Sequence, residues 1–201
     1  MTTKRMAIKS IAACAAAALA AGLLGACSEQ KQSFTSIDLT GANYAKDFEL
    51  TDHNGQVRHL KDFAGKVVVM FFGFTQCPDV CPTTMLEMAE IKKALGKDGD
   101  RLQALFVTVD PERDTPEILK AYMVNFDPTF LALYTTPDKL AQLAKDYKVY
   151  YKKVPGKTPT SYTIDHSAGS YVYDTKGQLR LFTRYGTGAA ALTADIRQLL
   201  L

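Results

Sequence analysis

The segment that decides the fold of this chain is Phe74-Thr75-Gln76-Cys77-Pro78-Asp79-Val80-Cys81-Pro82. It comes just after a continuous apolar run over residues 66–72, which is typical of a central strand buried on both faces. It leads into residues 82–95, where apolar side chains recur with the period of a helix before Gly96. The segment therefore joins a buried strand to a helix, and it carries two cysteines four positions apart.

Strands and helices alternate along the rest of the chain. A hairpin is predicted around the turn His53-Asn54-Gly55. Farther on we expect strands over 102–109, 130–134, 170–173 and 179–183, helices over 116–124, 137–147 and 190–200, and a loop or irregular hairpin over 150–162. This order indicates an α/β fold with a mostly parallel central sheet flanked by helices, and an N-terminal hairpin. A cysteine pair between a central strand and its helix is the thioredoxin-like (peroxiredoxin-like) layout.

The composition fits one globular domain behind an export leader. The chain has 201 residues, of which 47% are hydrophobic and 22% charged. The formal net charge is +3, but Lys4, Arg5 and Lys9 fall in the leader, and without them 21 basic residues face 21 acidic ones. A near-neutral domain gives no reason to expect nucleic acid as a partner.

Residues 1–26 are predicted to be a lipoprotein signal peptide. A basic start precedes an Ala- and Leu-rich run over 10–24, which is too short for a membrane-spanning helix. Leu24-Gly25-Ala26-Cys27 resembles a bacterial lipobox, with Cys27 as the lipidated N-terminus; the alternative is plain cleavage after Ala26. We expect a polar tether over 27–43 and the folded domain over 44–201, held by lipid on a membrane of the bacterial cell envelope and facing the oxidising periplasm.

Cys77 and Cys81 are the only cysteines that remain once the leader and Cys27 are set aside. In an exported protein such a pair forms a disulfide, a metal site or a redox couple. Each precedes a proline and so avoids the helical conformation, which predicts a loop with Cys81 near the helix cap and Pro82 as the first helical residue. Both sulfurs then lie near a helix N-terminus, which favours thiolates. Two thiolates suit Cu(I), and an added imidazole suits Cu(II) as well.

His166 is the candidate for that imidazole. The other two histidines, His53 and His59, fall in the N-terminal hairpin and are interpreted as surface or turn residues. His166 stands just before the strand over 170–173, where a thioredoxin-like sheet brings a loop opposite the cysteine loop. That loop usually holds a cis-proline, whereas this chain has Ala168 near the corresponding place. A hydrogen-bonded loop histidine is the ordinary alternative.

Three segments of the chain closely resemble the SCO/SenC family of copper-binding assembly factors. They are residues 72–82, Val109-Asp110-Pro111-Glu112-Arg113-Asp114-Thr115-Pro116, and Asp165-His166-Ser167. The resemblance covers about residues 47–200. It implies a thioredoxin-like fold, copper ligands Cys77, Cys81 and His166, and a supporting position near the site for Asp110. Gln76 stands where many members have His or Tyr, which removes an accessory imidazole but none of the three ligands.

The same resemblance implies a copper chaperone rather than an enzyme. Such a protein holds Cu(I) and Cu(II) and supplies copper to the dinuclear centre of cytochrome c oxidase. The expected partners are the copper-binding subunit of that oxidase, a periplasmic thiol reductase and another copper chaperone. The reductase is needed because an oxidising compartment drives the cysteine pair toward a disulfide, which offers copper no thiolate.

Three other functions remain open for the cysteine pair. A thiol–disulfide reductase would keep the copper-ligand cysteines of the oxidase reduced, although the three-residue spacer and the missing cis-proline weaken this reading. A peroxidase of the peroxiredoxin type is disfavoured because Thr75 lies only two residues before Cys77. A purely structural disulfide would close only a five-residue ring and so stabilise the fold weakly.

Overall fold

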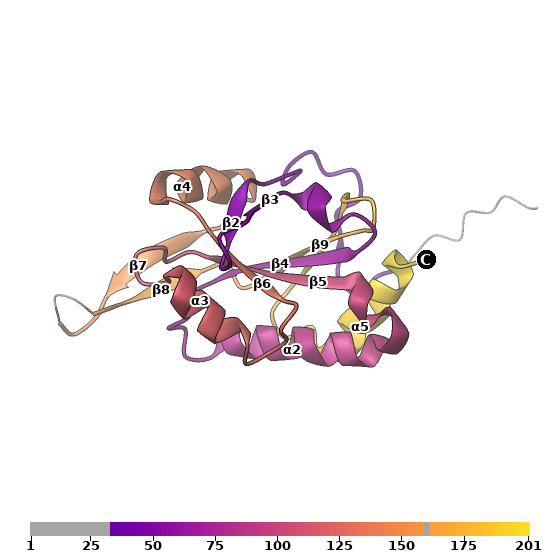
Figure 1. The fold of residues 1–201 in the computed structure, drawn as a ribbon. Helices are drawn as coiled ribbons and strands as arrows, with labels where there is room; N and C mark the ends of the chain where they lie inside the picture. Colours follow the sequence, from indigo (N-terminus) through magenta and orange to yellow (C-terminus); the bar gives the residue numbers. More distant parts are fainter. Residues whose placement is uncertain (1–32, 159–160) are drawn as a thin grey trace, which may run out of the picture. The chain divides into compact units, whose positions relative to one another are not determined.

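Strand β4 (Val67–Gly73) runs through the centre of an eight-stranded sheet because its side chains are apolar and every one of its residues is buried. The computed structural model describes residues 33–158 and 161–201, and the folded unit begins at Phe34. The strand order is β1-β10-β9-β4-β5-β6-β2-β3 (Figure 1). The bounds are β1 Ile37–Asp38, β2 Leu50–Asp52, β3 Val57–Arg58, β5 Leu102–Thr108, β6 Leu131–Tyr134, β9 Ser170–Tyr173 and β10 Leu179–Thr183.

The sheet is mixed, so the expectation of a mostly parallel sheet is wrong in this detail. Only β4 with β5 and β5 with β6 are parallel pairs. The turn over 174–177 joins β9 to β10, and a tight turn joins antiparallel strands. This hairpin inserts between β4 and β1, with β9 antiparallel to β4. The predicted N-terminal hairpin is confirmed as β2 and β3, on the other side of β6.

Helices cover both faces of this sheet, as the α/β prediction requires. Two successive right-handed crossovers, through α2 (Val80–Leu95) and α3 (Pro116–Met123), place both helices on one face. Helix α5 (Ala189–Leu199) packs beside α2 on that face, and α4 (Pro137–Asp146) lies on the other (Figure 1). Two short 3-10 helices, η1 (Leu60–Phe63) and η2 (Gly96–Arg101), complete the helical elements of the described residues.

A second, two-stranded sheet carries the segment that contains the third histidine. Strands β7 (Tyr151–Pro155) and β8 (Tyr162–His166) pair antiparallel, with Tyr151 opposite His166. This hairpin projects from the body of the folded unit (Figure 1). Of the two alternatives for residues 150–162, the hairpin is confirmed, and it extends to His166.

The N-terminal boundary differs from the predicted one. The backbone N–H groups of Thr35 and Ser36 donate to the Asp195 carboxylate at 2.9 and 2.8 Å, and β1 pairs with β10. Residues from Phe34 onward thus belong to the folded unit, and the predicted tether over 27–43 is wrong in its second half. A short polar stretch shows no periodicity, and here side-chain and edge-strand hydrogen bonds fix it. The predicted signal peptide and Cys27 lie outside the described residues.

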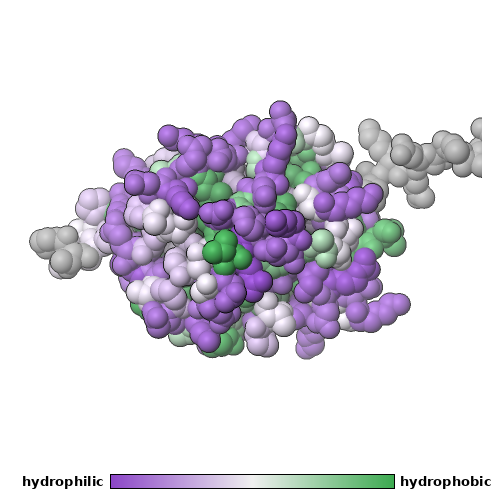
Figure 2. All heavy atoms as spheres, turned by 45° about the horizontal axis from the view of Figure 1, so that its top comes forward, coloured by the Kyte–Doolittle hydropathy of each residue, from purple (hydrophilic) through white to green (hydrophobic). Residues whose placement is uncertain are grey.

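The face of the folded unit that Figure 2 shows is largely polar. In the view of Figure 2 hydrophilic side chains predominate, and hydrophobic ones form small separate areas. Among the residues that the structure describes, none of the helices has both the length and the apolar character that membrane crossing demands.

Candidate metal centre

Cys77 and Cys81 lie where β4 gives way to α2. A turn closes the loop, with the Cys77 N–H donating to the Phe74 carbonyl at 3.2 Å. Helix α2 begins at Val80, so the prediction that Pro82 is the first helical residue is wrong by two positions. Pro82 falls in the first turn, where a backbone N–H has no helical partner, so the proline costs the helix no hydrogen bond.

The two sulfurs differ in their surroundings. Cys81 is fully buried, whereas Cys77 is half-buried, and neither forms a disulfide. The Cys81 N–H points at the Cys77 Sγ at 3.5 Å. Burial raises the pKa of the Cys81 thiol well above its ordinary range. Burial of Cys81 thus opposes the thiolate that a helix N-terminus is expected to favour.

His166 ends β8 and turns its ring toward the cysteines. The ring packs edge-on against Phe71 and Phe74, at centroid distances of 6.0 and 5.8 Å. Its Nδ1 lies 2.9 Å from the Ser167 carbonyl oxygen, which can only accept a hydrogen bond. Nδ1 therefore carries the proton, and the unprotonated Nε2 accepts from the Cys81 thiol, whose Sγ lies 3.5 Å away. Burial lowers the pKa of His166, which favours this neutral form.

One donor atom each from Cys77, Cys81 and His166 lie within 4.8 Å of one another. Within the described ranges no other group of three His, Cys, Asp or Glu residues is placed in this way. A single ion with bonds of about 2.0–2.3 Å in tetrahedral or trigonal geometry holds its ligands roughly 3.3–4.0 Å apart, so the three donor atoms need to approach one another by only about 1 Å to bind one ion. Binding there would displace the proton of Cys81, because a metal takes the thiolate.

The remaining histidines lie elsewhere, as the sequence indicated. His53 occupies the turn between β2 and β3, where its Nδ1 accepts from the Ala132 N–H at 3.1 Å. His59 follows β3, and its Nδ1 lies 3.1 Å from the Phe48 carbonyl. Neither belongs to the cluster of donor atoms.

Gly73, which sequence reasoning did not single out, makes room for the buried thiol. A Cβ on Gly73 would come within 2.8 Å of the Cys81 Sγ and 2.9 Å of the Phe106 ring. Real Cβ atoms do not approach other atoms so closely, so any larger residue displaces the sulfur or the ring. The sequence holds a weak signal for this role, namely a glycine that interrupts the apolar run just before the cysteine loop.

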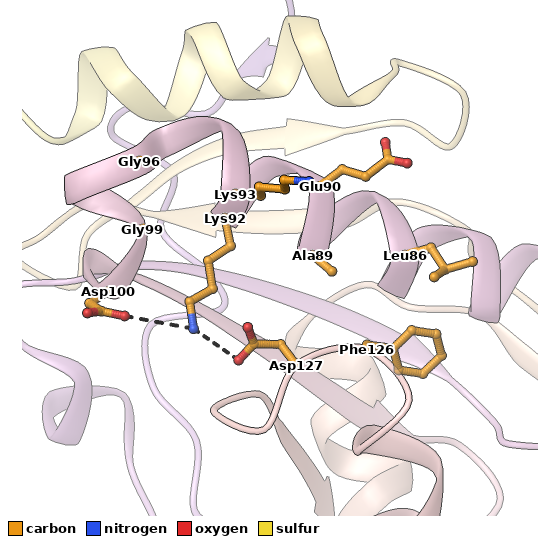
Figure 3. Close-up of a pocket in the computed structure, with 10 residues that line it drawn as sticks. All are labelled: Leu86, Ala89, Glu90, Lys92, Lys93, Gly96, Gly99, Asp100, Phe126 and Asp127. Atoms are coloured by element: carbon orange, nitrogen blue, oxygen red, sulfur yellow. Dashed lines mark hydrogen bonds and ion pairs between the residues drawn. The ribbon is translucent and has the colours of Figure 1, made fainter.

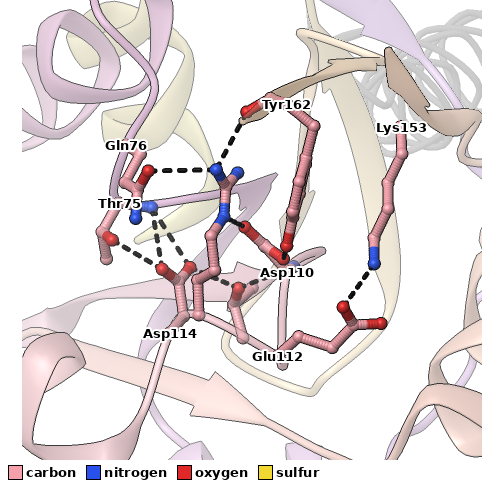
Figure 4. A network of polar contacts seen from close by, with 9 residues as sticks. Thr75, Gln76, Asp110, Glu112, Asp114, Lys153 and Tyr162 are labelled. Carbon is pink, nitrogen blue, oxygen red and sulfur yellow. Dashed lines mark hydrogen bonds and ion pairs between the residues drawn. The ribbon is translucent and has the colours of Figure 1, made fainter. Parts of the chain in front are cut away.

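Asp110 is fully buried in a polar network beside the cysteine loop (Figure 4). Its carboxylate pairs with Arg113 Nε and accepts from the Tyr162 hydroxyl at 2.7 Å. The neighbouring Asp114 accepts from the Thr75 hydroxyl at 2.5 Å. The hydrogen-bond and ion-pair partners of Asp110 are Thr108, Arg113, Tyr162 and Asp114, so any influence on the three donor residues passes through these partners. Arg113 and Tyr162 were not recognised as functional residues from the sequence.

A cavity of about 490 Å³ lies between α2 and the segment after α3, away from the metal cluster (Figure 3). Its lining includes Leu86, Phe126 and Lys92, and none of the three donor residues. Lys92 forms ion pairs across it with Asp127 at 2.9 Å and Asp100 at 3.9 Å. This cavity offers no clustered donor set like that at the end of β4.

Comparison with known proteins agrees with the geometry of the donors. The SCO1/SenC family model matches residues 38–201. An "SCO2-like protein" of Rickettsia felis is 38% identical over 133 residues, which cover 66% of this chain and 65% of that protein. "Protein SCO2 homolog, mitochondrial" of Bos taurus is 37% identical over 157 residues, which cover 76% of this chain and 58% of that protein. The match thus spans under two thirds of each relative's length.

The similarity extends to the three-dimensional structure. The structure of Bradyrhizobium japonicum ScoI with copper bound has a TM-score of 0.69 and 41% sequence identity, with 76% of this chain and 97% of that chain covered. The thioredoxin-like fold expected from the sequence is therefore confirmed. With the family model matching most of the chain, this protein belongs to the SCO1/SenC family.

Proposed function

We propose that this protein binds one copper ion through Cys77, Cys81 and His166. The observation that carries the proposal is the convergence of one donor atom from each residue within 4.8 Å. Two sulfurs and one imidazole nitrogen suit Cu(I) through the soft thiolates and Cu(II) through the added nitrogen. The copper-bound structure of the 41% identical ScoI supports copper as the metal.

The test is copper stoichiometry and spectroscopy on the reduced protein. We expect one copper per chain for the wild type, loss of Cu(I) binding in Cys77→Ser and Cys81→Ser, and loss of the Cu(II) spectrum in His166→Ala. His59→Ala is the matched control, because His59 is a half-buried histidine outside the cluster. If reduced wild type takes up no stoichiometric copper, or if His166→Ala keeps the wild-type Cu(II) spectrum, the proposed site is wrong.

The biological role that we propose is delivery of copper to the dinuclear centre of cytochrome c oxidase. Membership of the SCO1/SenC family supports this role, and the half-buried Cys77 gives an acceptor protein a route to the metal. The partners are the copper-binding subunit of the oxidase, a thiol reductase that keeps the pair reduced, and a further chaperone that supplies copper. Deleting the gene is expected to lower copper in the purified oxidase, and added copper to restore it in part.

The expected location follows from the leader. We propose that Cys27 is acylated and that a short tether then holds the folded unit at a membrane facing the periplasm. The pattern Leu24-Gly25-Ala26-Cys27 supports this proposal. Mass spectrometry of the mature N-terminus tests it, because acylation adds lipid to Cys27, whereas plain secretion leaves that residue unmodified.

A second function, thiol–disulfide exchange with the oxidase, is favoured by the unequal burial of the two thiols. A half-buried Cys77 can attack a partner disulfide, and the buried Cys81 beside it can resolve the mixed disulfide. The test is the reduction potential of the pair together with exchange against an oxidised peptide that carries the oxidase copper ligands. A potential too oxidising to reduce that peptide removes this function and leaves the copper site standing.

A further inference from the structure

Arg113 joins three segments that together build the metal centre. Its Nε pairs with the Asp110 carboxylate, which follows β5. Its Nη1 donates to the Gln76 side-chain oxygen at 3.0 Å and to the Tyr162 backbone carbonyl at 2.9 Å. Gln76 and Tyr162 lie on either side of this network (Figure 4). In the sequence Gln76 immediately precedes Cys77, and Tyr162 opens the strand that ends in His166.

The strand that carries His166 has few other attachments. Neither β7 nor β8 pairs with a strand of the eight-stranded sheet within the described residues. Ile164 is the only residue of these two strands that is buried. The ion pair between Lys153 and Glu112 at 2.6 Å is largely exposed, so it restrains the hairpin weakly. Apart from the packing of Ile164 and Tyr151 against the core, the position of β8 therefore depends on the contacts of Tyr162 and of His166 itself.

The Tyr162 side chain contacts both Arg113 and Asp110. The guanidinium of Arg113 lies 3.6 Å from the centre of the Tyr162 ring, and the Tyr162 hydroxyl donates to Asp110 at 2.7 Å. A planar guanidinium can stack on a ring and donate in several directions at once, which a lysine ammonium cannot do. Asp110 is fully buried and its ion pair with Arg113 holds the guanidinium in place, so a buried residue fixes the position of both Arg113 and Tyr162.

We propose that Arg113 is a positioning residue that holds the His166 strand against the cysteine loop. The clamp consists of Arg113, Asp110, Gln76 and Tyr162, and it sets the distance between the imidazole and the two sulfurs without touching any of them. Its effect on copper rests on the proposed function. Loosening the clamp frees the imidazole, whereas burial still holds Cys81 and the bond to the Phe74 carbonyl still holds Cys77, so Cu(II) is lost in preference to Cu(I).

The test compares Arg113→Lys with a matched control, Arg58→Lys. Both arginines use Nε to pair with a fully buried aspartate, Asp110 or Asp52, and Arg58 lies in the β2–β3 hairpin, outside the metal cluster. In each variant lysine keeps the positive charge beside the buried carboxylate. Tyr162→Phe is a milder second variant, since it removes only the hydroxyl bond to Asp110.

Two measurements test the clamp, namely amide hydrogen exchange in β8 and the affinity for Cu(II) and Cu(I). In the metal-free protein we expect Arg113→Lys to speed amide hydrogen exchange in β8 roughly tenfold, and Arg58→Lys to leave it unchanged. With copper we expect Arg113→Lys to weaken Cu(II) binding roughly 10- to 100-fold, and to change Cu(I) binding by less than about threefold. Tyr162→Phe should shift both readouts in the same direction by less.

Unchanged exchange in β8, or an equal loss of Cu(I) and Cu(II) affinity, would overturn the clamp. Absence of copper uptake by the wild type would instead overturn the proposed function. The exchange measurement needs no metal, so it still tests whether the clamp positions β8 if the wild type takes up no copper.

Discussion

At the scale of single residues, the proposed metal site depends on groups that pack closely against one another at the end of β4. The Cys81 thiol fills the space that Gly73 leaves, and the Phe71 and Phe106 rings close it from the side. The same burial that raises the pKa of Cys81 fixes the position of its sulfur. A ligand atom that is held in this way needs little rearrangement when it meets a metal.

Gly73→Ala is expected to disturb this site directly. The new Cβ would overlap the Cys81 Sγ and two aromatic rings, so we expect a loss of about 1–3 kcal/mol in the free energy of unfolding, as for other overpacked cores. Urea unfolding of the reduced, metal-free protein measures the loss. The variant should also bind copper more weakly, because the sulfur is pushed from its place.

The double variant Gly73→Ala/Cys81→Ala is the control for the cause of that loss. Removing the sulfur leaves the new Cβ only the rings to displace, so Gly73→Ala should cost less stability in the Cys81→Ala background. An equal cost in both backgrounds would show that the sulfur and the new methyl group do not compete for the same space.

Sequence reasoning reached the chemistry of these residues more easily than their surroundings. Cysteine spacing and the position of His166 predicted three residues whose donor atoms the structure brings together. The raised pKa of Cys81 and the space at Gly73 depend on what packs above them, including the Phe106 ring from β5. Such packing partners come from segments distant in the sequence, so local patterns do not reveal them.

At the scale of elements, one buried carboxylate holds the N-terminal segment on the folded unit. Asp195 in α5 is almost completely buried and accepts from two successive backbone N–H groups, those of Thr35 and Ser36. The Leu39 N–H, beyond β1, donates to the Arg180 carbonyl at 2.7 Å. The Asp195 carboxylate thus binds the two residues just before β1 and orients this edge strand.

Asp195→Ala is expected to release this strand. Two backbone donors lose their acceptor, and we expect a loss of about 1–3 kcal/mol in the free energy of unfolding. Hydrogen exchange of residues 35–39 should rise, whereas copper binding should remain, because none of the donor residues lies in this region. Asp195→Asn, which keeps one acceptor oxygen, should have a smaller effect; unchanged exchange in Asp195→Ala would contradict this role.

The predictability of the elements followed their length and periodicity. The long buried strands and the amphipathic helices were predicted close to their observed bounds, because a continuous apolar run or a helical apolar period marks them in the sequence. Strand β1 has only two residues, both exposed, and no pattern marks it. Strand β9 lies between β4 and β10 in the sheet. The apolar period of a segment predicts that it forms a strand, but it does not predict which strands it pairs with.

At the scale of the whole molecule, the proposed metal site combines residues that only the complete fold brings together. Cys81 and His166 are separated by 85 positions, and their donor atoms lie 3.5 Å apart. A ligand that binds all three donors therefore binds the folded state and not the unfolded chain. Copper binding and folding should then be linked, with the redox state of the cysteine pair controlling the linkage.

We therefore expect copper to stabilise the reduced protein and to leave the disulfide form unchanged. Free copper at 100 times the dissociation constant adds about 2.7 kcal/mol, which corresponds to a rise in Tm of roughly 5–11 °C for a domain of this size. Calorimetry of the reduced protein with buffered Cu(I), before and after a chelator, measures the shift and its reversal. Oxidation to the Cys77–Cys81 disulfide removes both thiolates, so the same copper should then move Tm very little. The Cys77→Ser variant controls for weak binding to surface groups. An equal rise in Tm for the reduced and oxidised forms would mean that copper binds elsewhere on the protein, because this oxidation removes the Cys77 and Cys81 thiolates.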